Sequence, residues 1–158
     1  MSGHAIRPLD LSDDETARAV LALQRAAYAV EAGLIGSDGI PALTETLERL
    51  RAAGESWLGA LDAETGRLAG AVAWRELDHG TVDICRLVVA PEAFRRGIAT
   101  ALLNALDSAF PGRSMVVSTG RTNEPAIALY RRRGFRPVRD REAAPGLWIT
   151  ELERPGRE

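Results

Sequence analysis

The sequence predicts an α/β or α+β fold, in which one β-sheet carries helices on its faces. Three observations support this prediction. Two helical segments follow a short first strand, strand-like runs joined by tight turns come next, and the second half alternates strand, helix, strand, helix and strand. With 158 residues, 46% of them hydrophobic and 27% charged, the chain resembles one soluble globular domain, expected over residues 1–158.

The chain is expected to begin with a short strand around Ile6, followed by a long helix. Ser12 and Glu15 have the spacing of a capping box, in which two side chains satisfy the first free N–H groups of a helix. Apolar residues then recur at helical spacing, which predicts a helix over about 13–31.

A second helix is expected from Pro41, a residue suited to a first helical turn, to near Gly54. The runs 56–61 and 67–74 are separated by a composition typical of a tight hairpin turn. Residues 81–89 give the strongest strand signal, because both alternating sets of positions are mostly β-branched or apolar. This pattern is typical of a central strand covered on both faces.

The second half supplies the remaining elements. Residues 98–106 are apolar over most of a helical circumference, which predicts a helix buried against the sheet. A strand at 115–118 precedes a helix that starts near Pro125 and ends at Gly134, a residue suited to the left-handed position after a helix. Residues 146–152 are expected to form the last strand.

The composition excludes several kinds of chemistry. All twenty basic residues are arginine, so Schiff-base catalysis through lysine and a P-loop are excluded. A formal net charge of −2 gives no general attraction for nucleic acid, which is not expected as a partner. One cysteine and the distant His4 and His79 predict no internal disulfide and no metal site. No apolar run suggests a membrane span or a signal peptide, so a cytoplasmic protein is expected.

A loop after the strand at 81–89 has the properties of an anion site. It leads into a helix whose first turn contains Gly97 and Ala99, small residues that let a ligand approach the backbone. The first free N–H groups, the helix dipole and the guanidinium groups of Arg95 and Arg96 would favour a pyrophosphate. A solvated surface loop is the alternative interpretation.

This loop resembles the coenzyme A loop of the GNAT superfamily of N-acetyltransferases, whose pattern is Q/R-x-x-G-x-G/A. Gly97 and Ala99 match its last two fixed positions, whereas Phe94 stands at the first. Backbone amides make most of the phosphate contacts in that superfamily, so the departure leaves them intact. The resemblance implies that acetyl-CoA contacts Arg95, Arg96, Gly97, Ile98, Ala99 and Thr100.

A second segment resembles the other motif of the superfamily, N-x-x-A-x-x-L-Y-x-x-x-G-F. Residues from Asn123 to Phe135 match every fixed position, and about 26 residues separate Gly97 from Asn123. This spacing leaves room for one helix and one strand. The resemblance also implies that Asn123 contacts the pantetheine or pyrophosphate arm. A plain helix cap is the other interpretation of Asn123.

The resemblance implies a GNAT fold. That fold has a central, mixed, mostly antiparallel sheet of six to seven strands, about four helices on its faces and a splayed central strand pair. Residues 1–54 would then hold the acceptor-binding helices, 81–110 the pyrophosphate-loop motif and 114–137 the second coenzyme A motif. Pantetheine would enter the gap beside Leu87, Val88 and Val89, where a backbone N–H would polarise the thioester carbonyl.

Tyr130 is the predicted general acid. Thioester aminolysis expels a thiolate, and a tyrosine, with a reference pKa of about 10, is protonated at neutral pH and can donate to it. Simple packing of Tyr130 in the core is the alternative.

The attacking amine must also lose a proton, and Asp83 is the candidate base. It lies on the strand before the loop, where histone-acetylating relatives carry a catalytic glutamate. An ion pair with Arg86 or Arg75 is the alternative, and Cys85 beside it is expected to be a core residue.

The acceptor would be bound by the first two helices and the loop that connects them. Tyr28, Glu31 and Asp38 are the expected substrate contacts, and acidic side chains there would attract a cationic amine.

The resemblance of the two motifs to the GNAT superfamily implies an N-acetyltransferase that moves an acetyl group from acetyl-CoA to a primary amine by direct attack in a ternary complex. The acceptor is expected to be a small molecule or a peptide, and the protein a monomer or a homodimer. Two alternatives are a non-catalytic acyl-CoA-binding regulatory module and an interaction domain that uses the arginines at 131–133. The helix dipole also favours cations at that helix end.

Overall fold

The computed structural model describes residues 3–35 and 45–157, with the side chains of 31–35 excepted. Its elements, in chain order, are β1 (His4–Pro8), α1 (Asp14–Ile35), α2 (Leu47–Ala52), β2 (Ser56–Asp62), β3 (Leu68–Glu76), β4 (Val82–Val89), α3 (Ile98–Ala109), β5 (Met115–Gly120), α4 (Glu124–Arg132), β6 (Arg136–Ala144) and β7 (Leu147–Arg154). Single 3₁₀ turns lie at Asp78–Gly80 and Pro91–Ala93.

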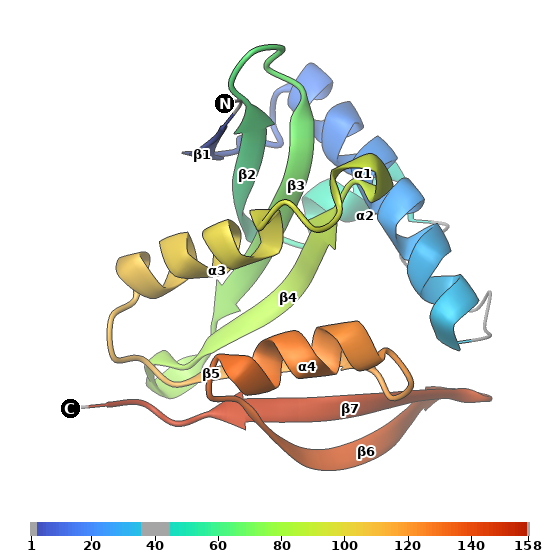
Figure 1. The fold of residues 1–158 in the computed structure, drawn as a ribbon, viewed down its shortest axis with the longest axis vertical. Coiled ribbons are helices and arrows are strands. Elements are labelled where there is room, and N and C mark those ends of the chain that lie inside the picture. The colour runs from blue at the N-terminus through green and yellow to red at the C-terminus, as the bar shows by residue number, and fades with distance from the viewer. Residues whose placement is uncertain (1–2, 36–44, 158) are drawn as a thin grey trace.

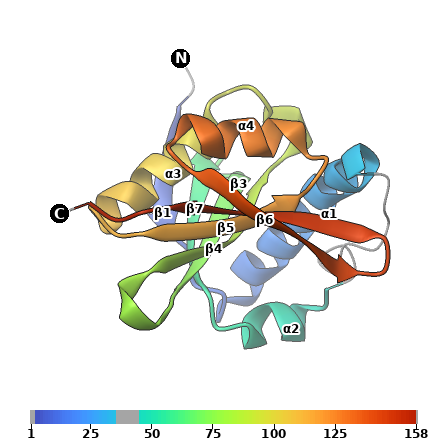
Figure 2. The ribbon, with the colours of Figure 1, turned by 90° about the horizontal axis from the view of Figure 1, so that it is seen from below.

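The strands form one mixed sheet in the order β1-β2-β3-β4-β5-β7-β6 (Figure 1). Only the β4–β5 pair is parallel, and all the other neighbours are antiparallel. Helices α3 and α4 cover one face of the sheet, and α1 and α2 cover the other (Figure 2). The predicted mixed, mostly antiparallel sheet with helices on both faces is confirmed.

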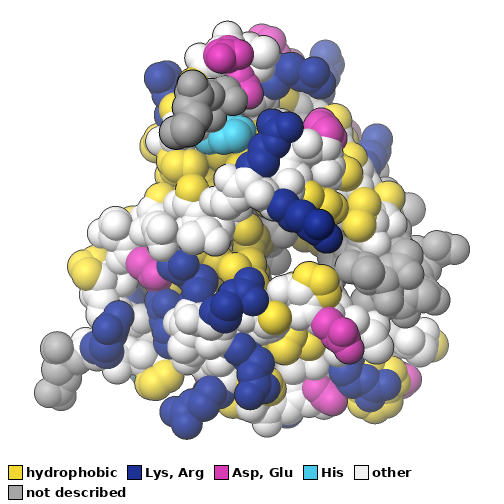
Figure 3. All heavy atoms as spheres, viewed as in Figure 1, with side chains coloured by type: hydrophobic (Ala, Val, Ile, Leu, Met, Phe, Trp, Pro, Cys, Tyr) yellow, Lys and Arg dark blue, Asp and Glu magenta, His cyan; other side chains and the backbone are white. Residues whose placement is uncertain are grey.

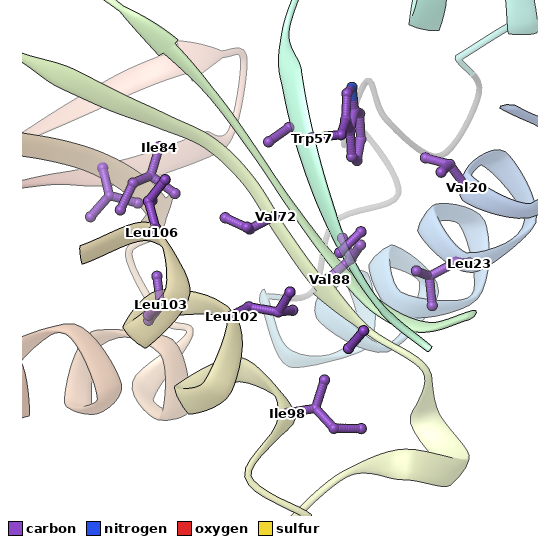
Figure 4. Close-up of a cluster of buried hydrophobic side chains, with 14 of the residues drawn as sticks. Val20, Leu23, Trp57, Val72, Ile84, Val88, Ile98, Leu102, Leu103 and Leu106 are labelled. Carbon is purple, nitrogen blue, oxygen red and sulfur yellow. The ribbon is translucent and has the colours of Figure 1, made fainter. Parts of the chain in front are cut away.

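The hydrophobic core lies on both sides of the central strands. Leu102 and Leu106 of α3 are fully buried on one side, and Val20 and Leu23 of α1 are buried on the other (Figure 4). Each buried aliphatic side chain of this size contributes about 1.5–3 kcal/mol. These contacts fix both helices against the strands that border the site.

Strand β4 contains a β-bulge at Cys85. Ala73 of β3 lies opposite Arg86, and the next residue, Trp74, lies opposite Ile84, so Cys85 has no partner on β3. Residues directly opposite one another share a face of the sheet, and adjacent residues point to opposite faces. Arg86 and Ile84 therefore point to opposite faces, although residues two apart in a regular strand would share one.

The bulge directs Arg86 to the face covered by α1. Trp74 contacts the ring of Phe110 at the end of α3, with ring centroids 6.0 Å apart, so Ile84 opposite Trp74 lies on the α3 face. Arg86 points the other way. The sequence interpretation of 81–89 as a regular strand missed this bulge, because a register shift belongs to a strand pair rather than to one strand.

The bulge coincides with the point where β4 and β5 separate. Their ladder has three pairs, Val82 with Met115, Asp83 with Val116 and Ile84 with Val117. Beyond Ile84 the two strands diverge, whereas β4 remains paired with β3 as far as Val89. The splayed central strand pair is confirmed.

Strand β6 was not predicted from the sequence. All of its residues but the last are exposed, and charged residues dominate it, so it lacks an alternating apolar signal. It lies at the edge of the sheet, where Pro137 and two register shifts against β7 limit its pairing.

Two helix starts also differ from expectation. Asp13 rather than Ser12 caps α1, because the Asp13 carboxylate accepts the Thr16 N–H at 3.0 Å. Helix α2 begins at Leu47 with Thr46 as its cap, and Pro41 lies outside the described residues. None of the helices in the described ranges combines the length and the apolar character needed to cross a membrane.

Candidate functional site

A cavity of about 570 Å³ opens where β4 and β5 diverge. Helix α1, strands β4 and β5, the loop before α3, the first turn of α3 and helix α4 all contribute to its lining. Figure 3 shows the surface hollowed in this region, with basic side chains near the rim. The predicted cofactor residues that line the cavity are Leu87, Val88, Val89, Arg95, Gly97, Ile98, Ala99, Thr100, Asn123 and Tyr130. Arg96 is exposed and is not among the lining residues.

The loop before α3 leaves room for a ligand. Gly97 stands at the N-cap of α3 in the left-handed conformation, with φ 74°, and Arg95 is also left-handed, with φ 66°. A Cβ on Gly97 would meet no atom within 4 Å, and no side chain caps the helix. The first N–H groups of α3 therefore face the cavity without a side-chain acceptor of their own, as an anion site requires.

Tyr130 is held in the cavity wall by the end of its own helix. The Phe135 N–H donates to the Tyr130 carbonyl at 3.0 Å, and the Gly134 N–H donates to the Arg131 carbonyl at 3.1 Å. This pair of bonds is a Schellman motif, which needs the left-handed Gly134, with φ 90°. The rings of Tyr130 and Phe135 meet edge to face, with centroids 5.5 Å apart. The G-F end of the second motif thus positions its tyrosine.

Asn123 caps a helix, as one of the two interpretations from the sequence expected, and it also borders the cavity. Its side-chain oxygen accepts the Ala126 N–H at 3.3 Å, so it caps α4. It is 9% exposed and also lines the cavity.

Asp83, the expected base, is held in an ion pair beside Cys85. Asp83 is not among the residues that line the cavity. Its carboxylate lies 3.5 Å from the Arg75 guanidinium, which is the alternative interpretation made from the sequence.

Cys85 lines the cavity but is poorly suited to nucleophilic attack. Burial, together with the charges of Asp83 and Glu55, raises the pKa of its thiol to about 11. The S–H group lies 3.4 Å from the Asp83 carbonyl oxygen. The thiol is therefore protonated at neutral pH, and a thiolate would be needed to accept an acyl group.

A group that sequence reasoning missed lies at the α1 side of the cavity. Arg86 lines the cavity and is surrounded by Glu45, Glu55 and Gln24, which together form the Arg86 cluster. The three charged side chains are only 7–15% exposed. Two carboxylates face one guanidinium, so the cluster has a formal charge of −1. The guanidinium also lies 5.6 Å from the centre of the Trp57 ring.

In this cluster, Glu45 and Arg86 each shift the pKa of the other in the direction that favours its charged form. Burial raises the pKa of Glu45, but hydrogen bonds from Arg86 and Gln24 lower it by more. Burial lowers the pKa of Arg86, and the hydrogen bond to Glu45 and the charge of Glu55 raise it by more. A lone arginine in the most apolar strand of the sequence could have predicted buried carboxylate partners.

The expected acceptor contacts are only partly visible. Tyr28 lines the cavity from α1, together with Ala27 and Val30. The Glu31 side chain and Asp38 lie outside the described residues.

The arginines at 131–133 do not act as one basic surface. Arg133 is bound by Asp107 at 2.7 Å and by Asn104 at 2.9 Å, whereas Arg131 and Arg132 are exposed. Among the residues that the structure describes, no group of three His, Cys, Asp or Glu side chains could hold a metal ion.

Known proteins with similar sequences cover most of this chain. A 135-residue segment is 38% identical to the UPF0157 protein YqkA of Bacillus subtilis, covering 85% of this chain and 38% of that protein. A mycothiol acetyltransferase of Thermobifida fusca is 31% identical over 163 residues, covering 94% of this chain and 48% of that protein. The chain therefore spans less than half the length of these two relatives.

Solved structures share the fold. The ribosomal-protein-S18-alanine N-acetyltransferase of Escherichia coli superposes with a TM-score of 0.75 and 16% identity, covering 100% of this chain and 96% of that one. A PaiA N-acetyltransferase of Thermoplasma acidophilum, solved in complex with coenzyme A, gives a TM-score of 0.70 and 17% identity, covering 98% and 99%.

The family model of the GNAT acetyltransferases matches residues 20–135. This segment runs from α1 through both motifs to Phe135 and contains the Arg86 cluster and the cavity. The chain belongs to the GNAT family of acetyltransferases.

Proposed function

We propose that this chain transfers an acetyl group from acetyl-CoA to a primary amine by direct attack in a ternary complex. The observation that carries the proposal is the cavity between β4 and β5, which connects the open N-terminus of α3 with Tyr130. The GNAT family supports the donor class, and a related fold has been solved with coenzyme A.

The donor would bind through the backbone of two elements. The N–H groups at the start of α3 and the Arg95 guanidinium would hold the pyrophosphate, because both favour an anion. From Cys85 to Val89, β4 has no ladder partner on β5 among the described residues. Pantetheine amides could pair with this free edge like an added strand.

The chemical step would use Tyr130 as the general acid. The amine nitrogen attacks the thioester carbonyl carbon, so a C–N bond forms and the C–S bond breaks. The electron pair of that bond goes to sulfur, the Tyr130 hydroxyl donates a proton to the thiolate, and water that has taken the proton of the amine returns one to Tyr130. A backbone N–H of β4 would stabilise the oxyanion of the intermediate.

The amine would lose its proton to water in the cavity. The Asp83 carboxylate is paired with Arg75 and is not among the groups that line the cavity, so we assign it no direct proton transfer. Initial rates with a lysine-containing peptide should then rise with pH towards the pKa of the amine, about 10, and Asp83→Asn should change kcat/KM by less than about threefold. A hundredfold loss in Asp83→Asn would restore Asp83 as the base.

The acceptor would approach from the α1 side, where Tyr28 lines the cavity. We propose a small-molecule or peptide amine. One protein of the same fold is named for an alanine of ribosomal protein S18, and one sequence relative is named for mycothiol.

The first test is a calorimetric titration of the protein with acetyl-CoA, repeated with Gly97→Glu. Added bulk and negative charge at the pyrophosphate position should weaken binding at least about a hundredfold. Gly66→Glu is the matched control: Gly66 lies in the β2–β3 turn with φ 72°, also with open space around it. It carries the same backbone strain and charge and should bind like the wild type.

Tyr130→Phe tests the chemical role. The variant should bind acetyl-CoA normally but lose about 10²–10⁴-fold in kcat, because general acid catalysis contributes that much. Binding of acetyl-CoA without transfer to any primary amine would instead support the non-catalytic module. No binding to the wild type would reject the proposal.

A further inference from the structure

Arg86 has no free donor left for a substrate. A guanidinium has five N–H groups, and each of these has a protein acceptor. Its Nε donates to Glu55 at 2.8 Å. Nη1 donates to Gln24 at 2.7 Å and to Glu45, and Nη2 donates to Glu45 at 3.1 Å and to Glu55 at 3.2 Å. Arg86 therefore acts on the protein and not as an anion receptor.

The Arg86 cluster joins four parts of the chain. Gln24 belongs to α1, one turn before Tyr28 in the cavity wall, and is fully buried. Glu45 precedes α2, Glu55 precedes β2, and Arg86 belongs to β4. The fork of one guanidinium can bind two carboxylates side by side, a geometry that lysine cannot reproduce.

The cluster also favours one of two possible registers of β4 against β3. In a regular strand, Arg86 would share the face of Ile84 and point into the apolar core beneath α3. A charge buried there without a partner would be strongly unfavourable. The bulge at Cys85 instead brings Arg86 to its two carboxylates, so the cluster favours the bulged register.

The bulge starts directly after the last β4–β5 pair, Ile84 with Val117. A regular β4 would lack the bend that carries its C-terminal half away from β5. The partners of Arg86 are thus linked, through the strand, to the opening between the two strands.

We propose that Arg86, held by Glu45, Glu55 and Gln24, is a positioning residue that maintains the bulge at Cys85 and so keeps β4 and β5 apart for the acyl group. Arg86 acts through the backbone of β4. The catalytic consequence rests on the proposed acetyl transfer, whereas the opening between the strands does not.

Cys85 supplies a test that is independent of activity. It is the only cysteine of the chain and it lines the cavity. Its rate of alkylation by iodoacetamide, measured without acetyl-CoA at several pH values and corrected for the thiolate fraction of each variant, therefore reports the opening. In Arg86→Lys the reaction should become at least about fivefold slower, because three donors cannot hold both carboxylates and the gap narrows.

Glu45→Gln provides a second, milder variant. It leaves Arg86 paired with Glu55, so the protein should fold, and Cys85 should react about twofold more slowly. Asp107→Asn, which alters an ion cluster on the other face of the sheet, is the control and should react like the wild type. An unchanged rate in Arg86→Lys would overturn the proposal, and so would a faster rate, which would indicate local unfolding.

The kinetic readout separates this inference from the proposed function. In Arg86→Lys, kcat with acetyl-CoA should fall at least about tenfold, while calorimetric affinity for CoA changes by less than about threefold. An inactive wild type with slower alkylation in the variant would reject the acetyl transfer but keep the positioning role. An active wild type with unchanged kcat in the variant would reject the positioning role.

Discussion

Two partly buried arginine–carboxylate clusters lie on opposite faces of the sheet, and their compositions mirror each other. The Arg86 cluster places two carboxylates around one guanidinium. The second, the Asp107 cluster, places the guanidinium groups of Arg133 and Arg154 around one carboxylate, that of Asp107. The first has a formal charge of −1 and the second of +1.

The two clusters fix different structural elements: helix ends in one case and a strand register in the other. Asp107 lies in the last turns of α3, Arg133 caps the end of α4, and Arg154 closes β7. Arg154 also donates to the Arg133 carbonyl at 3.2 Å. The Asp107 cluster therefore ties two helix ends to the sheet, whereas the Arg86 cluster fixes a strand register beside the cavity. Similar chemistry can serve stability in one place and the site in another.

The largest effect is expected from Arg86→Met. It leaves Glu45 and Glu55 largely buried without a cation, and breaking a buried ion pair in this way costs about 3–5 kcal/mol. Denaturant unfolding followed by fluorescence measures the loss. A loss below about 1 kcal/mol would mean that the two carboxylates are readily hydrated in the folded protein.

Asp107→Asn should have a smaller effect on stability. Asp107 is 35% exposed, so water can partly replace the carboxylate, and we expect a loss of about 1–2 kcal/mol in the free energy of unfolding. Affinity for acetyl-CoA and kcat should stay within about twofold of the wild type. A tenfold fall in kcat would show that the Asp107 cluster also affects catalysis, so that the two clusters would not differ in this respect.

The pH dependence of stability sharpens the same comparison. Burial raises the pKa of Asp107, but hydrogen bonds and charges from Arg154 and Arg133 lower it by more, so its folded pKa lies below its unfolded value. Asp107 therefore contributes fully to the free energy of unfolding above about pH 4. This contribution is lost as the pH falls through the lowered pKa of Asp107 in the folded protein. The difference in unfolding free energy between wild type and Asp107→Asn should shrink below about pH 4. A difference that stayed constant down to pH 2 would exclude this carboxylate as its source.

The smallest effect is expected from Glu151→Gln. Glu151 binds Arg139 and Arg141, in the same two-to-one ratio as the Asp107 cluster, but both arginines are more than half exposed. Exposed pairs contribute little, so the midpoint of thermal unfolding should not change measurably. If Glu151→Gln lowered the free energy of unfolding as much as Asp107→Asn does, the ratio of arginines to carboxylates would matter more for stability than burial.

The parts of the site that were predictable are short and contiguous. The left-handed Gly97 before α3 and the Schellman motif that ends the helix of Tyr130 each depend on residues a few positions apart, and sequence spacing specifies such local features. The order of most strands and helices followed from periodicity and turn residues in the same way.

The missed parts depend on pairing between distant residues. The bulge at Cys85 exists only in the register of β4 against β3. Arg86 meets Glu45 and Gln24 across 41 and 62 positions of the chain. Position along a strand also could not show that Asp83 lies outside the cavity lining.

Every ion pair described above uses arginine as its cation, and this affects whether the cation can be acetylated. A lysine exposed in the wall of the cavity would place a primary amine beside the proposed acetyl donor, where it could itself be acetylated and lose its charge. A guanidinium has a pKa far above neutral pH, so it keeps its proton and is a poor nucleophile. With no lysine at any of 158 positions, the chain presents no side-chain amine to an activated acetyl group. Its ion clusters are thus chemically inert towards the proposed donor.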